Sequence, residues 1–148
     1  MDYVPVYRHV QEGRFIRALL LGIAAVILIP TLILEFSMAG PHFLIGTIVA
    51  PILVIVSGMF GSMTIDVTQT DVRWKFALGW PGGRILRSEL REATLENPGL
   101  LNGIGVHLTM RGWLWNVALG PAVGLRKRDG GEVILGTDDP DGLIAALR

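Results

Sequence analysis

The sequence predicts an α+β protein in which a two-helix transmembrane hairpin precedes a small domain of antiparallel strands. Two uncharged apolar runs predict the hairpin, one from Ala18 to Leu34 and the other from Phe43 to Phe60. From Ser62 onward, apolar and polar residues alternate with a period of two, which is typical of strands. The predicted parts are an N-terminal segment at 1–17, transmembrane helices at 18–34 and 43–61, a connecting loop at 35–42 and a domain at 62–148.

The two apolar runs have the length and composition of membrane spans. At 1.5 Å per residue, each run nearly covers the roughly 30 Å of a bilayer's hydrocarbon core. One alternative is a pair of buried helices in a soluble protein, but a 148-residue globule could hardly enclose both. Another is a cleaved signal peptide, although Ser37-Met38-Ala39 only loosely resembles a cleavage site. Even then, the second run would still anchor the chain.

The short loop predicts that the two helices pack antiparallel. Small residues spaced four apart would let the two backbones approach closely. These pairs are Ala18 and Gly22, Gly46 and Ala50, and Ser57 and Gly61. Pro51 lacks a backbone N–H and is expected to bend the second helix.

The distribution of positive charge predicts the sidedness of the chain. Three arginines precede the first run, whereas the loop at 35–42 carries no Lys or Arg. Because cytoplasmic flanks are enriched in Lys and Arg, both termini are expected in the cytoplasm of a multi-pass protein of the cell (inner or plasma) membrane. The absence of cysteine agrees with a cytosolic domain.

Alternating residues predict about seven strands in the domain. The first two, Met63–Val67 and Val72–Leu78, flank a tight turn at Gln69-Thr70 and should form an antiparallel hairpin. A strand or a transition is expected at 93–96. Further strands are expected at 85–86, 106–110, 113–117, 123–125 and 133–135, separated by turns rich in Gly, Pro and Asp.

The chain is predicted to end in a short helix. Asp139 can cap its first turn, and Pro140 suits the first helical position. Leu143, Ile144 and Leu147 then share one face. This face is expected to close over an open end of the sheet, which completes a small sandwich or partly open barrel.

This order of elements resembles the bacterial membrane-anchored proteins with a pleckstrin-homology-like (PH-like) domain. The resemblance rests on the first strand pair, on Gly103-Ile104-Gly105-Val106, and on the segment from Gly130 to Pro140 that leads into the last helix. It implies a seven-stranded antiparallel barrel or sandwich plugged by a C-terminal helix. It also implies a role in protein contacts or self-assembly at the membrane.

Eukaryotic relatives of this fold often hold phosphoinositide headgroups with basic residues around the first hairpin. This chain departs from that pattern, because its turn is Gln69-Thr70-Asp71 and only Arg73 and Lys75 lie close by. The domain carries ten basic and ten acidic residues, so it has no net positive field. Specific phosphoinositide binding and nucleic-acid binding are therefore not expected.

No motif predicts catalysis, a cofactor or a metal. Gly103-x-Gly105 is followed by a strand rather than a helix, so it does not fit a dinucleotide loop. His107 lacks a second ligand at a suitable spacing. Glu35 and His42 could form a proton-sensitive pair, but they are more simply residues of an interfacial loop. The chain is therefore predicted not to be an enzyme and to need no cofactor.

Three groups of residues are candidates for contact with a partner or the membrane. Trp80 lies in a Gly/Pro turn and could rest at headgroup level, where indole is favoured. Leu100 and Leu101 lie in a polar loop, where they could contact another subunit or pack over the end of the barrel. The basic run Arg126, Lys127 and Arg128 could bind headgroups or an acidic partner. A solvated hairpin tip is favoured, because neighbouring acidic residues can neutralise this run.

The sequence thus predicts a membrane-anchored PH-like interaction module. In this hypothesis, the domain mediates protein–protein contact or self-assembly at the cytoplasmic face of the membrane. One alternative is an accessory subunit of a transporter or membrane-enzyme complex, with the helices as the main contact. The other is a domain that binds lipid headgroups at its own membrane.

Overall fold

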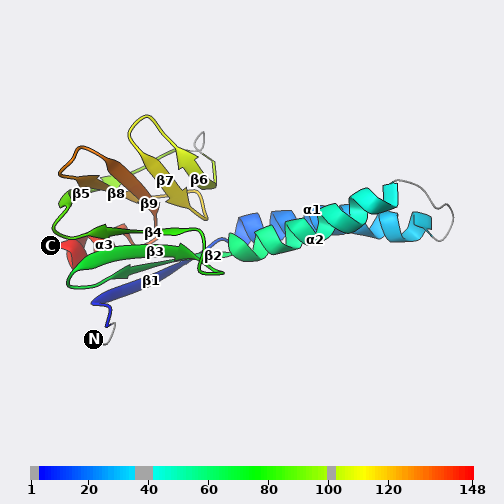
Figure 1. The fold of residues 1–148 in the computed structure, drawn as a ribbon, viewed down its shortest axis with the longest axis horizontal. Helices are drawn as coiled ribbons and strands as arrows, with labels where there is room; N and C mark the ends of the chain where they lie inside the picture. The colour runs from blue at the N-terminus through cyan, green and yellow to red at the C-terminus, as the bar shows by residue number, and fades with distance from the viewer. Residues whose placement is uncertain (1–3, 36–41, 100–102) are drawn as a thin grey trace.

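The computed structural model describes residues 4–35, 42–99 and 103–148, which form three helices and nine strands. The protein is α+β: a helix pair extends from one end of a domain built of two sheets (Figure 1). In chain order the elements are β1 Tyr7–Glu12, α1 Arg14–Glu35, α2 His42–Met59, β2 Ser62–Val67, β3 Asp71–Phe76, β4 Gly82–Leu86, β5 Leu90–Glu96, β6 Gly105–Leu108, β7 Trp113–Asn116, β8 Ala122–Lys127, β9 Glu132–Gly136 and α3 Pro140–Leu147.

The two sheets pack face to face around one apolar core. The first sheet has the strand order β1-β2-β3-β4, and the second has the order β5-β8-β9-β7-β6. Inward-facing side chains of both sheets form the core, together with Leu143 of α3. The fully buried members include Met63, Ile65, Val67, Val72, Val117, Val123, Leu125 and Leu135. This arrangement confirms the predicted α+β class with a closing C-terminal helix.

The first hairpin forms as the sequence predicts. β2 and β3 pair antiparallel, with Val67 opposite Val72, and the Thr68 amide donates to the Asp71 carbonyl at 2.8 Å across the turn. The strands predicted farther along correspond to β4 through β9, and the segment at 93–96 belongs to β5. The bounds differ in places: β3 ends at Phe76 rather than Leu78, β4 begins at Gly82, and β5 begins at Leu90.

The prediction of a wholly antiparallel domain is wrong for one strand pair. β7 and β9 pair parallel, with Trp113 opposite Val133 and Trp115 opposite Leu135. β9 inserts between β7 and β8, so the chain leaving β7 crosses over this strand before it enters β8. Among the described residues, the domain from Ser62 onward has eight strands rather than about seven. A period of two marks a strand but does not specify its neighbour or direction.

The N-terminal segment contributes a strand that the sequence analysis missed. β1 pairs antiparallel with β2 along its whole length, from Tyr7 opposite Val67 to Glu12 opposite Ser62. Its inward-facing residues include the polar His9 and Gln11, so it lacks the apolar alternation of the other strands. The helix pair is therefore inserted between two adjacent strands of one sheet, and both of its ends meet the domain at the same place (Figure 1).

The two helices lie side by side along most of their length (Figure 1). Gly46 faces Thr31 so closely that a Cβ at this glycine would lie 2.2 Å from the Thr31 Oγ1 atom. Ala24, Ala50 and Ser57 are buried along the same seam. The predicted contact through Gly22 does not form, since a Cβ there would have no neighbour within 4 Å.

The structure supports a membrane span for one of the two predicted helices. In α1, the stretch Arg14–Ile33 has the length and apolar composition to cross a bilayer. In α2, the described apolar stretch Gly46–Met59 is shorter. Among the described residues, one helix rather than two therefore meets the criteria of length and composition for a membrane span.

The C-terminal helix begins as predicted. The Gly142 amide donates to the Asp139 carboxylate at 3.0 Å, and Pro140 occupies the first helical position. Leu143 points into the core between the sheets, where it is fully buried. α3 is therefore fixed both by its cap and by its apolar face.

Replacing Leu143 with alanine is expected to lower the free energy of unfolding by about 2–5 kcal/mol, because it opens a cavity in the shared core. Thermal and denaturant unfolding of the detergent-solubilised chain would measure the loss. Leu95→Ala is the matched control, since Leu95 lies on β5 with most of its side chain exposed. Equal losses in the two variants would contradict the assignment of α3 to the core.

Candidate functional site

The end of the domain that joins the helix pair, here called the proximal end, is built from both sheets. The Gly13 amide donates to the Gly61 carbonyl at 2.9 Å, which closes the base of the helix pair. A Cβ at Gly13 would lie 2.6 Å from the Phe60 carbonyl oxygen and 2.9 Å from that of Val117. Glycine is therefore required there, because β1, α2 and the β7–β8 loop converge on this residue.

The β3–β4 turn also belongs to the proximal end. The Ala77 amide donates to the carbonyl of Met59, the last residue of α2, at 3.2 Å. The chain then reverses at Gly79, which has a φ of +84° that favours glycine. Leu78 and Trp80 flank this glycine and are 66% and 73% exposed. The turn thus presents two large apolar side chains beside the end of the helix pair.

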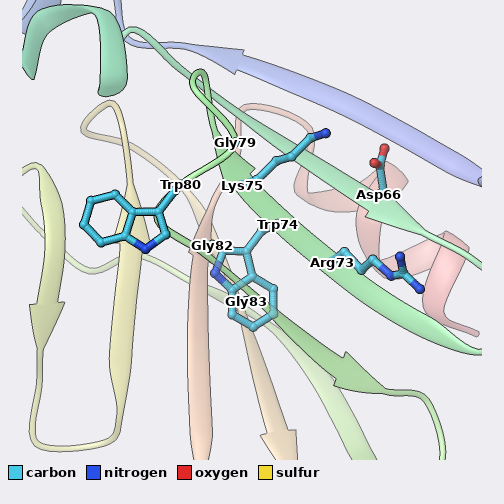
Figure 2. Close-up of a pocket in the computed structure, with 8 residues that line it drawn as sticks. All are labelled: Asp66, Arg73, Trp74, Lys75, Gly79, Trp80, Gly82 and Gly83. Carbon is cyan, nitrogen blue, oxygen red and sulfur yellow. The ribbon is translucent and has the colours of Figure 1, made fainter. Parts of the chain in front are cut away.

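A shallow hollow of about 380 Å³ lies beside this turn. Figure 2 shows the indole of Trp80 projecting from the turn, away from Asp66 and Arg73. Trp74 fits against the edge strand only because residue 83 is glycine, where a Cβ would lie 2.3 Å from the indole ring. The lining residues are Asp66, Arg73, Trp74, Lys75, Gly79, Trp80, Gly82 and Gly83. The hollow is therefore lined by cationic side chains, by two indole rings and by exposed backbone at the glycines, and all of these groups can contact another molecule.

Ion pairs organise the outer face of the first sheet. Asp66 accepts from Arg8 across the β1–β2 pair, with an Nε–Oδ1 distance of 2.6 Å. The carboxylate of Asp71 is buried and binds the guanidinium groups of Arg73 and Arg84, at 2.9 Å and 2.6 Å. The Thr68 hydroxyl donates to the same carboxylate at 2.7 Å. The hydrogen bonds from Arg73 and Thr68 lower the pKa of Asp71 below its ordinary value, despite its burial.

The basic run Arg126, Lys127 and Arg128 lies at the opposite end of the domain, on the hairpin between β8 and β9 (Figure 1). Arg126 pairs with Glu92 at 2.7 Å, and Lys127 lies 3.7 Å from Asp129. These contacts agree with the interpretation of a solvated hairpin tip. Leu100 and Leu101 lie outside the described residues.

An exposed apolar patch on the β6–β7 hairpin was not identified from the sequence. It consists of Leu108, Met110 and Trp113, and we call it the β6–β7 patch. Leu108 and Trp113 are directly opposite each other on the two strands, and Trp113 is 48% exposed. A Cβ at Gly105, the first residue of β6, would lie 3.8 Å from the Phe60 ring, whereas Leu108 is at the other end of this strand. Trp115 on the same strand packs against the core between the sheets, whereas Trp113 does not.

The histidines do not assemble a metal site in the part of the chain that the structure describes. This part holds no group of three or more His, Asp or Glu side chains that could share a metal ion. His9 is bound to the carboxylate of Asp138. His107 lies on β6, close to Gly103 and Gly105. The side chains of Glu35 and His42, the predicted interfacial residues, lie outside the described part.

Comparison with protein-family models and with curated proteins finds no match to this chain. Its function is therefore inferred from the geometry of the described residues.

Stability is expected to fall in acid because of Asp71. Its folded-state pKa lies below the ordinary value of 3.8, so its contribution is complete above that pH and is lost as the pH falls through the folded-state pKa. Asp71→Asn should weaken this decline and should also lower stability at neutral pH. Unfolding measured between about pH 7 and pH 2, a range that extends well below 3.8, tests both effects. Asp141→Asn, which removes an exposed carboxylate of α3, is the control.

Proposed function

We propose that this protein is a membrane-anchored interaction module. The helix pair is a two-pass anchor with both chain termini in the cytoplasm. It holds a PH-like domain at the cytoplasmic face, where the domain contacts another protein or further copies of itself. The observation that carries this proposal is the pairing of β1 with β2 across the helix pair.

The pairing of β1 with β2 links the two helices to one side of the membrane. β1 precedes α1 and β2 follows α2, and the two strands are joined over six residue pairs. If α1 crosses the bilayer, the chain must return before Ser62 to complete this ladder. The span in α1 therefore requires a second crossing, and α2 is the segment available for it.

The side chains on the outside of both helices support insertion of the pair. Large apolar side chains are exposed on α1 at Val26 and Ile33, and on α2 at Ile48, Ile52 and Ile55. Soluble monomers rarely expose a continuous apolar surface that covers two whole helices. In a bilayer the same side chains meet lipid, and the helical backbone satisfies its own hydrogen bonds.

Positive charge at the start of α1 supports the cytoplasmic orientation. Arg14 and Arg17 lie in the first turns of the helix, with their side chains directed outward. Long cationic side chains at a helix end can keep their charge at the headgroup level while their stems contact lipid. Together with Arg8, they make this flank positive, which favours retention on the cytoplasmic side.

The arrangement of the domain supports a PH-like fold. Two packed sheets are closed by a C-terminal helix, which is the arrangement that the resemblance implies. The domain departs from that expectation in the parallel pairing of β7 with β9 and in the strand supplied from before the helices. These features belong to this chain's version of the sandwich.

The β6–β7 patch supports the protein contact. Its three apolar side chains are exposed on one hairpin, where Leu108 and Trp113 lie directly opposite each other. Confinement to the membrane raises the effective concentration of the domain for other membrane proteins. A small surface such as this patch can then be sufficient for association.

A second candidate function is that of an accessory subunit held through its helices. A hollow of about 450 Å³ lies between α1 and α2 near Pro51 and is lined by apolar side chains such as Leu21, Leu28 and Val54. Small residues on its floor, including Ala24 and Ala50, would allow a third helix to approach closely. Exchange of the helices for an unrelated hairpin distinguishes this candidate, because it would abolish association although the domain remains folded.

Labelling from either side of the membrane tests the two-pass anchor. The chain has no cysteine, so single cysteines can be placed at Val4, Met110 and Ser37. An impermeant maleimide is expected to modify positions 4 and 110 from the cytoplasmic side only, and position 37 from the other side only. Labelling of positions 4 and 110 from opposite sides would show a single crossing and contradict the proposal.

Photo-crosslinking in intact membranes tests the interaction module. A photoreactive residue at Met110 is expected to crosslink to a second copy or to another polypeptide. Native mass spectrometry of the gently extracted protein should then show multiples of 16.1 kDa or an added mass. The same residue at Gln69, an exposed position on the β2–β3 turn, is the control. Absence of crosslinks at Leu108, Met110 and Trp113, with only monomer in the spectrum, would overturn this function.

A further inference from the structure

We propose that the β3–β4 turn is a lipid-contact element, with Leu78 and Trp80 inserted into the headgroup layer of the protein's own membrane. The contact holds the domain in one orientation against the bilayer. This inference rests on the proposed anchor, because it requires the end of α2 to lie at the membrane surface.

The position of the turn relative to the membrane is set by short, fixed connections. Only Phe60 and Gly61 separate α2 from β2, and the Phe60 ring packs edge-on against Phe76 of β3 with centroids 4.9 Å apart. The hydrogen bond from the Ala77 amide to the Met59 carbonyl joins the turn directly to the helix end. The turn therefore cannot move far from the place where α2 would leave the bilayer.

The short separation between the β3–β4 turn and the end of α2 matches the thickness of the headgroup layer. The polar region adds roughly 5–8 Å to each side of the hydrocarbon core. A turn joined by one backbone hydrogen bond to the last residue of an apolar helix falls within that layer. The tip of the turn is also free to approach lipid, since a Cβ at Gly79 would meet no atom within 4 Å.

The side chains of the turn suit an interface between water and hydrocarbon. β3 places Trp74 and Phe76 in the core, whereas Leu78 and Trp80 lie beyond the strand and remain exposed. Indole is favoured at headgroup level, because its ring is apolar and its N–H can donate to polar groups. Lys75 on the neighbouring outer face can place its ammonium group among the phosphates while its stem remains near the turn.

A second turn at the proximal end has the same character. Leu119 in the loop between β7 and β8 is also exposed, and Val117 of that loop lies against Gly13 at the base of α1. Each sheet therefore has a turn with exposed apolar side chains at the proximal end: the β3–β4 turn in the first sheet and the β7–β8 loop in the second. The charged β8–β9 hairpin and the β6–β7 patch lie elsewhere, so the exposed apolar tips do not all require the same partner.

Site-directed spin labelling tests this contact on the full-length chain. Single cysteines are introduced at Leu78, at Gln69 as an exposed control on the β2–β3 turn, and at Ile55 as a control for the anchor. Each variant is labelled with a nitroxide and placed in vesicles of phosphatidylcholine and phosphatidylglycerol. Power saturation then compares the accessibility of each nitroxide to oxygen, which partitions into lipid, and to a water-soluble nickel complex.

The proposal predicts that the nitroxide at position 78 loses most of its accessibility to nickel relative to position 69 and gains accessibility to oxygen. If position 78 is as open to nickel as position 69 while position 55 is in lipid, the contact is wrong and the anchor stands. If position 55 is open to nickel, the anchor fails and this inference fails with it. Leu78, Gln69 and Ile55 are exposed, and an unchanged unfolding temperature in detergent confirms that each variant is folded.

Discussion

The antiparallel pairing of β1 with β2 is the constraint on which the rest of the structure depends. It joins a strand before the helix pair to a strand after it, so it closes the longest loop in the first sheet. Closing a long flexible loop would carry an entropic cost, but two antiparallel helices return the chain to its starting point. The hydrogen bond between Gly13 and Gly61 marks this return. Packing of the helices and completion of the sheet therefore support each other.

Side-chain hydrogen bonds join β1 to the C-terminal part of the domain, in addition to the packing of Tyr7 against the core. The Tyr7 hydroxyl donates to the Asp139 carboxylate at 2.9 Å, and His9 is bound to Asp138. Burial and the neighbouring carboxylates raise the pKa of Tyr7, so its hydroxyl remains protonated and continues to donate at physiological pH. Because Asp139 also caps α3, the same carboxylate links the first strand to the last helix.

Features encoded by neighbouring residues could be predicted from the sequence. The apolar runs, the β2–β3 hairpin and the Asp139-Pro140 helix start each depend on residues close together in the chain. The strand β1 and the parallel β7–β9 pair could not be predicted, because the partner of each lies far along the sequence. A polar edge strand such as β1 also lacks the apolar alternation by which strands are recognised.

For the candidate contact residues too, the local sequence predicted the chemical character of each group but not its position in the fold. The Gly/Pro turn around Trp80 indicated an exposed indole, but only the hydrogen bond between Ala77 and Met59 places it beside the helix end. The basic run at Arg126–Arg128 has the composition of a headgroup site, yet the topology places it at the far end of the domain. Composition identified what these residues could bind, and strand order determined what lies within their reach.

The helix pair and the domain are joined by very short connections, which restrict how the domain can rotate relative to the helices. One residue separates β1 from α1 and two separate α2 from β2, so the domain is attached to the helix pair at two closely spaced points. A domain on a single flexible tether would rotate freely and would lose that freedom on binding. Two short connections, together with Phe60 packed against Phe76, restrict this rotation beforehand. In the proposed module, the β6–β7 patch would face a fixed direction, and a partner in the same membrane would meet it at a smaller entropic cost.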